Sequence, residues 1–163
     1  MALTDYTDYD SIRAALGVSA KDLSDTALAV DYYLHELEQS LLELNADILT
    51  DYSTATGEST TASANFVRAV RLYSANFVAG LCSGVSANLI AKSITNGRGG
   101  FSRQTEKVQL KAIQALLDKV RASQVRLRSA YAVYSPSSGV STVTVPPTFL
   151  AVSELDTDPV TGS

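Results

Sequence analysis

The stretch ASANFVRAVRLYSANFVAGLCSGVSANLIAKSI, residues 62–94, decides the fold. Its large apolar side chains recur at steps of three or four residues, as one buried face of an α-helix requires. These side chains are Phe66, Val70, Tyr73, Phe77, Leu81, Val85 and Leu89. The spacing predicts a long central helix over about residues 62–94.

The preceding part of the chain also shows helical periodicity. Residues 8–16 predict a short helix that Gly17 ends, because glycine readily adopts the left-handed conformation just past a helix terminus. An apolar stripe predicts a second helix over residues 25–50, and the small polar residues 51–63, with Gly57 at their centre, predict a loop. The stripe consists of Ala27, Val30, Leu34, Leu37, Leu41, Leu44 and Ile48.

A fourth helix is predicted from Ser102 onward, after the helix-breaking residues 96–100. Ser102 can cap this helix, and Glu106 lies in its first turn, where a carboxylate is favourable near the positive end of the helix dipole. Gln124 interrupts the apolar seam as a polar position that can help to fix register. The seam is Leu110, Ile113, Leu117, Val120, Leu127, Tyr131 and Tyr134. The pattern therefore indicates an all-α fold, a small antiparallel bundle of about four helices formed by residues 1–134.

Residues 135–163 differ in character from the bundle. Residues 135–139 are typical of a turn, residues 140–145 alternate as a short strand does, and Pro146-Pro147 excludes a helical continuation. We expect an extended C-terminal arm with too little apolar surface for a core but enough to dock on another chain. The expected docking residues are Val140, Val143, Val145, Phe149, Leu150, Val152 and Leu155.

Charge is distributed unevenly along the 163 residues, although the net charge is only -4 and disfavours a general nucleic-acid binder. Residues 1–60 hold twelve Asp or Glu against two basic residues, and residues 61–134 hold eleven Lys or Arg against two acids. We expect the acidic second helix and the basic fourth helix to be neighbours, either inside one fold or between copies in a ring. The side chains expected on these charge faces are Glu36, Glu43, Asp47, Arg121, Arg126 and Arg128.

The sequence offers no arrangement that favours catalysis, cofactor binding or a metal centre. His35 is the only histidine, and its neighbours favour a surface or interface position over a metal ligand. Cys82, the only cysteine, lies in an apolar helical run and is expected to be a buried, inert thiol. The glycine-rich residues 97–100 follow a helix, whereas nucleotide-binding loops of the familiar kind follow a strand. A small enzyme is therefore the least favoured reading.

Neither export nor membrane insertion is expected. Residues 1–10 carry acids where a signal peptide has a basic start. The uncharged residues 72–91 approach the length of a membrane span, with Gly80 and Gly84 at a spacing used by membrane helix dimers. The serines and asparagines in this stretch make it too polar for such a span. A single cysteine suits a reducing cytoplasm.

One segment carries a resemblance to a known family. Residues 8–28, DYDSIRAALGVSAKDLSDTAL, resemble the N-terminal region of the head-to-tail adaptor (connector) proteins of tailed bacteriophages. In that family a short helix and an Asp- or Ser-capped turn lead into a long helix. The matching residues are Ser11 to Val18, then Leu23, Asp25 and Leu28, and the whole segment is about an eighth of the chain.

The resemblance implies a structural virion protein at the head–tail interface, made in the host cytoplasm. It would form a ring, typically of twelve copies, with its arm on the portal protein and its opposite end offered to tail or nozzle proteins. Contact of the ring with channel DNA would be non-specific. The alternative is a cytoplasmic helical protein-interaction or regulatory module that uses the same charged faces without forming a ring.

Overall fold

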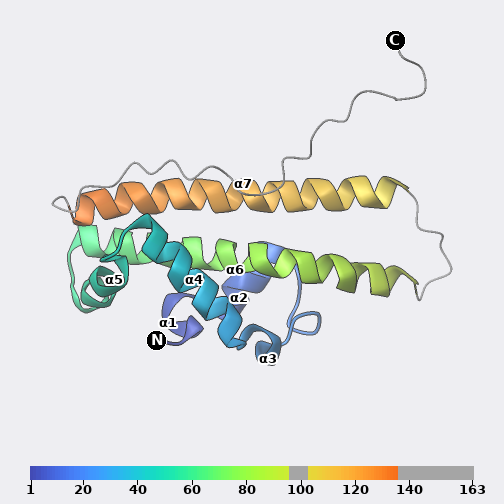
Figure 1. The fold of residues 1–163 in the computed structure, drawn as a ribbon, viewed down its shortest axis with the longest axis horizontal. Coiled ribbons are helices and arrows are strands. Elements are labelled where there is room, and N and C mark those ends of the chain that lie inside the picture. The colour runs from blue at the N-terminus through green and yellow to red at the C-terminus, as the bar shows by residue number, and fades with distance from the viewer. Residues whose placement is uncertain (96–102, 136–163) are drawn as a thin grey trace, which may run out of the picture.

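Two long helices, α6 (Thr61–Thr95) and α7 (Arg103–Tyr134), lie side by side and run in opposite directions (Figure 1). The computed structural model describes residues 1–95 and 103–135, and places side chains for residues 1–83 and 111–135. Throughout the described residues the regular structure is helical, without strands, as the sequence predicts. The bounds of α6 and α7 agree closely with the two helices that the apolar stripes indicate.

Five short helices precede α6 in the chain. α1, α2, α4 and α5 all contact it, and α4 crosses it obliquely (Figure 1). α5 lies at the end where α6 begins and α7 ends, while the other end of the α6–α7 pair extends beyond the short helices. Their bounds are α1 Leu3–Tyr6, α2 Tyr9–Leu16, α3 Asp25–Leu28, α4 Asp31–Leu44 and α5 Ile48–Gly57.

The short helix predicted over residues 8–16 is confirmed as α2. Asp8 precedes it, and its Oδ1 accepts a hydrogen bond of 2.6 Å from the backbone N–H of Ser11, which satisfies one of the free amides of the first turn. Gly17 follows the helix with φ 72°, a left-handed conformation that residues with a side chain rarely adopt. Both ends of α2 therefore follow directly from the sequence.

The continuous helix predicted over residues 25–50 is wrong, because the chain leaves the helical conformation twice. Val30 is extended between α3 and α4, and Asn45 is extended after α4. The side-chain Oδ1 of Asn45 accepts a hydrogen bond of 2.8 Å from the backbone N–H of Asp47, so this side chain takes a donor that a continuing helix would use. Val30, placed on the buried stripe by the sequence, is exposed.

The loop predicted over residues 51–63 is also wrong in its first half, which belongs to α5. Ile48, Tyr52 and Ala55 are buried and recur at helical spacing. The hydroxyl of Thr54 donates to the carbonyl oxygen of Thr50 at 3.1 Å, so a polar side chain is satisfied within the helix. Burial of one face therefore outweighs the weak helix propensity of the Ser and Thr residues in this segment.

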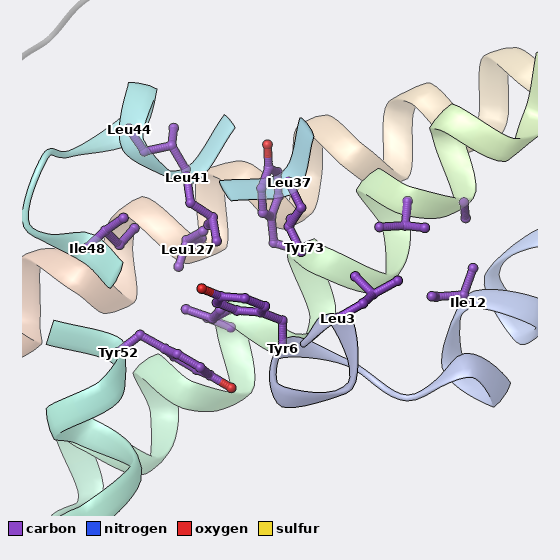
Figure 2. Packing of buried hydrophobic residues seen from close by; sticks show 14 of the residues in the cluster. Leu3, Tyr6, Ile12, Leu37, Leu41, Leu44, Ile48, Tyr52, Tyr73 and Leu127 are labelled. Atoms are coloured by element: carbon purple, nitrogen blue, oxygen red, sulfur yellow. The ribbon is translucent and has the colours of Figure 1, made fainter. Parts of the chain in front are cut away.

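The core forms where α4, α5 and α1 meet the α6–α7 pair. Figure 2 shows Leu41 of α4 close to Leu127 of α7, with Tyr6 of α1 beside Tyr52 of α5. Phe66 lies at the centre of an aromatic cluster, because its ring stacks on Tyr134 at 5.0 Å and tilts against Tyr131 at 5.2 Å. The Tyr6 and Tyr52 rings stack at 5.4 Å. Aromatic contacts thus link four helices.

The buried seam of α7 is rotated slightly from the predicted one. Leu127 and Tyr131 are buried as expected, whereas Leu117, Val120 and Gln124 are only half-buried. The residues buried in their place are Leu116 and Ser123. The hydroxyl of Ser123 donates to the carbonyl oxygen of Val120 at 2.8 Å. A small residue at 123, satisfied by its own helix, permits close packing at the seam.

Several predictions fall outside the described residues. The break at residues 96–100 and the Ser102 cap belong to this group, as do the arm over residues 135–163, apart from Ser135, and every docking residue assigned to it. The side chains of Val85, Leu89 and Leu110 are likewise outside the described set.

Candidate assembly surfaces

The outward face of α4 combines acids with large apolar side chains. Tyr32 is 55% exposed and Leu42 is 38% exposed, and Asp31 and Glu43 are exposed beside them. Steps of three, four and one residue along the helix put all of these positions on one side. We call this surface the α4 face, and it consists of Asp31, Tyr32, His35, Gln39, Leu42 and Glu43.

The outward face of α7 combines basic residues with a strip of small apolar side chains. Val125 is 64% exposed and Val133 is 69% exposed, the highest exposures among the apolar residues larger than alanine in the described chain. Ala122 and Ala132 are exposed on the same side of the helix. We call this surface the α7 face, and it consists of Asp118, Lys119, Arg121, Ala122, Val125, Arg126, Ser129, Ala132 and Val133.

The predicted charge-face residues lie largely at the surface. Glu43 and Asp47 are exposed and Glu36 is half-buried, and on α7 Arg121 and Arg126 are exposed while Arg128 is half-buried. The side chains described here form ion pairs only between Arg13 and Asp10, Arg13 and Asp25, and Arg121 and Asp118, so none joins α4 to α7. Most charged side chains of the α4 face and the α7 face are therefore accessible to solvent or to a partner.

Tyr73, a buried residue of α6, lies near charged side chains of both α4 and α7. Burial raises the pKa of the Tyr73 hydroxyl, which lies 2.6 Å from the hydroxyl of Ser40 on α4. The negative charge of Glu43 raises this pKa further and the positive charge of Arg128 lowers it. Glu43 and Arg128 thus act on the same buried hydroxyl without forming an ion pair with each other.

Tyrosine hydroxyls bind several of the remaining acids. Tyr131 donates to Asp51 Oδ2 at 2.7 Å, and Tyr134 lies 3.3 Å from Glu58 Oε1. Tyr6 donates to Glu38 Oε1 at 3.1 Å, and burial together with this carboxylate raises the Tyr6 pKa. These contacts connect α7 to α5 and α1 to α4. The acids of α5 are therefore part of the packing, unlike Asp31 and Glu43.

The segment of residues 8–28 is held together by one buried cation. The side chain of Arg13 donates to Asp10 Oδ1 at 2.8 Å and to the carbonyl oxygen of Leu23 at 2.8 Å, and it pairs with Asp25. A buried guanidinium needs such partners because its charge has lost contact with water. Sequence reasoning missed this role, although Arg13 is one of only two basic residues in the first 60.

The residues considered for chemistry are dispersed. His35 is exposed on the α4 face, and the described part of the chain has no group of three or more His, Cys, Asp or Glu side chains able to hold a metal ion. An open pocket of about 400 Å³ lies between α1, α5 and α6, where Asp5, Tyr52 and Arg71 contribute to its lining. The Tyr52 hydroxyl has a structural role in this pocket, since it donates to the carbonyl oxygen of Asp5 at 2.7 Å.

Cys82 is buried in α6, as predicted, and we expect it to be unreactive in the folded protein. Burial raises the pKa of its thiol, although a hydrogen bond with Tyr33 lowers it in part. A thiol-specific disulfide reagent at neutral pH should label native protein at least about a hundredfold more slowly than protein unfolded in urea, because labelling requires local opening. Equal rates in the two states would show that the thiol is accessible.

Among the helices as far as the structure describes them, none combines the length and apolar character needed to cross a membrane. No known protein family, curated protein or solved structure matches this chain.

Proposed function

We propose that the chain is a structural, non-enzymatic assembly protein, a head-to-tail adaptor that forms a ring between the portal and the tail of a tailed bacteriophage. The observation that carries the proposal is the pair of oppositely charged outward faces, each with exposed apolar side chains. A chain with two such faces is suited to bind two neighbours at once. A ring adaptor needs this property.

The N-terminal segment supports the same function. Residues 8–28 carry the family resemblance, and their matching positions include the Arg13 and Asp25 pair and the buried Ile12 and Leu28. The resemblance thus includes residues that fix the conformation of the segment that precedes α4. In the proposal, this segment and the other short helices form a small helical bundle with α6 and α7.

The proposal assigns the extended C-terminal arm, residues 135–163, to the portal. Val140, Val143 and Val145 are interspersed with Ser and Thr residues, and a second apolar group follows Pro146-Pro147. Docking would order these residues, and burial of their apolar side chains would offset the lost chain entropy. The opposite end of the ring would bind tail or nozzle proteins. The assembled ring would be located in the virion, at the head–tail interface.

The arm is tested by replacing two of its apolar residues. The double substitution Phe149→Ser and Leu150→Ser should weaken binding to purified portal protein at least about tenfold, because each side chain contributes more than about 1.4 kcal/mol when fully buried. Biolayer interferometry with immobilised portal measures this change.

The matched control is Ser137→Ala and Ser138→Ala in the same segment, which should bind as wild type does. Circular dichroism checks that the helical part is unchanged in both proteins. Portal binding that persists in the Phe149 and Leu150 variant and after removal of residues 135–163 would refute the arm. A wild type that binds no portal but captures one cytoplasmic protein would favour the interaction-module alternative.

A further inference from the structure

We infer that the α4 face of one copy binds the α7 face of the next copy of the same chain. This inference rests on the proposed function and deepens it, because it names the two surfaces that would join neighbours in a ring. It depends on three features of these faces: their exposed apolar residues, their charges and their different positions on one molecule.

The apolar residues of the two faces have complementary sizes and spacing. Tyr32 and Leu42 are large and lie ten residues apart on α4, which is about 15 Å at the rise of an α-helix. The strip from Ala122 to Val133 on α7 consists of small side chains and extends over about 16 Å. Large side chains on one helix can therefore seat along the small strip of the other, as ridges fit into grooves in helix packing.

The charges of the two faces are also complementary. Asp31 and Glu43 lie beside the apolar residues of α4, and Arg121 and Arg126 lie beside the strip of α7. Asp118 is the one acid on the α7 face and lies 3.5 Å from Arg121. Both of these side chains are mostly exposed, and exposed pairs of this kind are weak, so Arg121 can exchange this partner for a carboxylate of a neighbour.

Charge excludes pairing of either face with itself. Two α4 faces would bring acids against acids, and two α7 faces would bring bases against bases, which is unfavourable at an interface. The favourable contact therefore joins two different surfaces, and such a heterologous contact leaves each joined pair of copies with one free face of each kind. α7 lies along one edge of the molecule while α4 crosses α6, so one copy can use both faces together (Figure 1). Repetition gives a closed ring or a filament.

Two variants test the inference. The α7-face variant is Arg121→Glu with Arg126→Glu, and the α4-face variant is Asp31→Lys with Glu43→Lys. Native mass spectrometry and sedimentation velocity should show oligomers for wild type and monomers for each variant alone, with self-association weakened at least about 100-fold. All four positions are exposed or at a helix surface, so circular dichroism and thermal melting should show that both variants remain folded.

Mixing the variants gives the sharpest result. The α7-face variant carries two acidic faces and the α4-face variant carries two basic faces, so an equimolar mixture should assemble again, into oligomers in which the two variants alternate. A chain with all four substitutions should assemble again, because both of its faces have exchanged charge. The control Lys21→Glu with Arg68→Glu makes the same change in net charge as the α7-face variant, at exposed positions outside the two faces, and should assemble as wild type does.

Several results would overturn the inference. These are assembly of either face variant alone to the extent seen for wild type, a mixture in which the two variants do not associate, or a wild type that is monomeric at its highest soluble concentration. If the α7 face instead bound residues 136–163 of its own chain, reversal of its charges would leave the oligomeric state unchanged, which also counts against the inference. Portal binding, measured in parallel, separates the two proposals. A wild type that does not bind portal protein refutes the adaptor function, whereas the pairing of the two faces is judged by the oligomeric state alone.

Discussion

Replacement of Phe66 by alanine should lower the free energy of unfolding by about 3–5 kcal/mol, the range for removal of a fully buried aromatic side chain. Phe66 is completely buried, and its ring contacts Tyr52 of α5 and both Tyr131 and Tyr134 of α7. Alanine would leave a cavity among three aromatic rings, each of which is fixed by its own hydroxyl, so the site cannot collapse easily.

Urea unfolding followed by circular dichroism measures this loss. The matched control is Val133→Ala on the exposed side of α7, which should change the free energy of unfolding by less than about 0.5 kcal/mol. If Phe66→Ala were no more destabilising than Val133→Ala, the aromatic cluster would not be part of the core, and the packing of α6 on α7 would have to be revised.

The second large effect is expected at Leu127, where alanine should cost about 2–5 kcal/mol. Leu127 is completely buried on α7 and lies close to Leu41 of α4 in the core (Figure 2). Its removal would leave a cavity where α4 meets α7, and the described residues show no ion pair between these two helices that would compensate.

Val125→Ala is the control for Leu127, because it removes an apolar side chain only two residues away on the exposed side of the same helix. Its effect should stay within about 0.5 kcal/mol. Thermal melting at low protein concentration, where copies do not associate, separates this intrachain effect from assembly. An equal loss in both variants would indicate that α7 is turned differently from the arrangement described here.

The long helices and α2 could be predicted because each has a clear local signal. An unbroken apolar stripe defines α6, and Asp8 and Gly17 mark the ends of α2 by their capping chemistry. α1 could not be predicted, since a helix of four residues has almost no periodicity. It depends on the burial of Leu3 and Tyr6 and on the hydrogen bond from Tyr6 to Glu38.

The errors arose where tertiary contacts decide the local structure. The apolar stripe continues in register across Asn45, so periodicity alone does not reveal the break, although Asn45 and Asp47 are residues typical of turns. Asn45 Oδ1 also lies 3.2 Å from the hydroxyl of Tyr131, a contact 86 residues away in sequence. α5 was missed for the opposite reason, because its Ser and Thr residues concealed the spacing of Ile48, Tyr52 and Ala55.

Of the candidate site, the sequence could predict the kinds of charge but not their surroundings. Counting acids and bases identified α4 and the C-terminal half of α7, yet the exposed strip of Val125 and Val133 depends on how α7 is rotated against α6. The half-buried position of Arg128, unlike the exposed Arg121 and Arg126, depends on the same rotation. The role of the arm remains a prediction from sequence.

The most direct test of the adaptor proposal is quantitative peptide mass spectrometry of infectious particles purified from the source on a density gradient. The proposal predicts that this chain is present at a fixed stoichiometric ratio to the portal protein. Absence of the chain from infectious particles would contradict the proposal and would leave a cytoplasmic interaction or regulatory module as the function that fits the two charged faces.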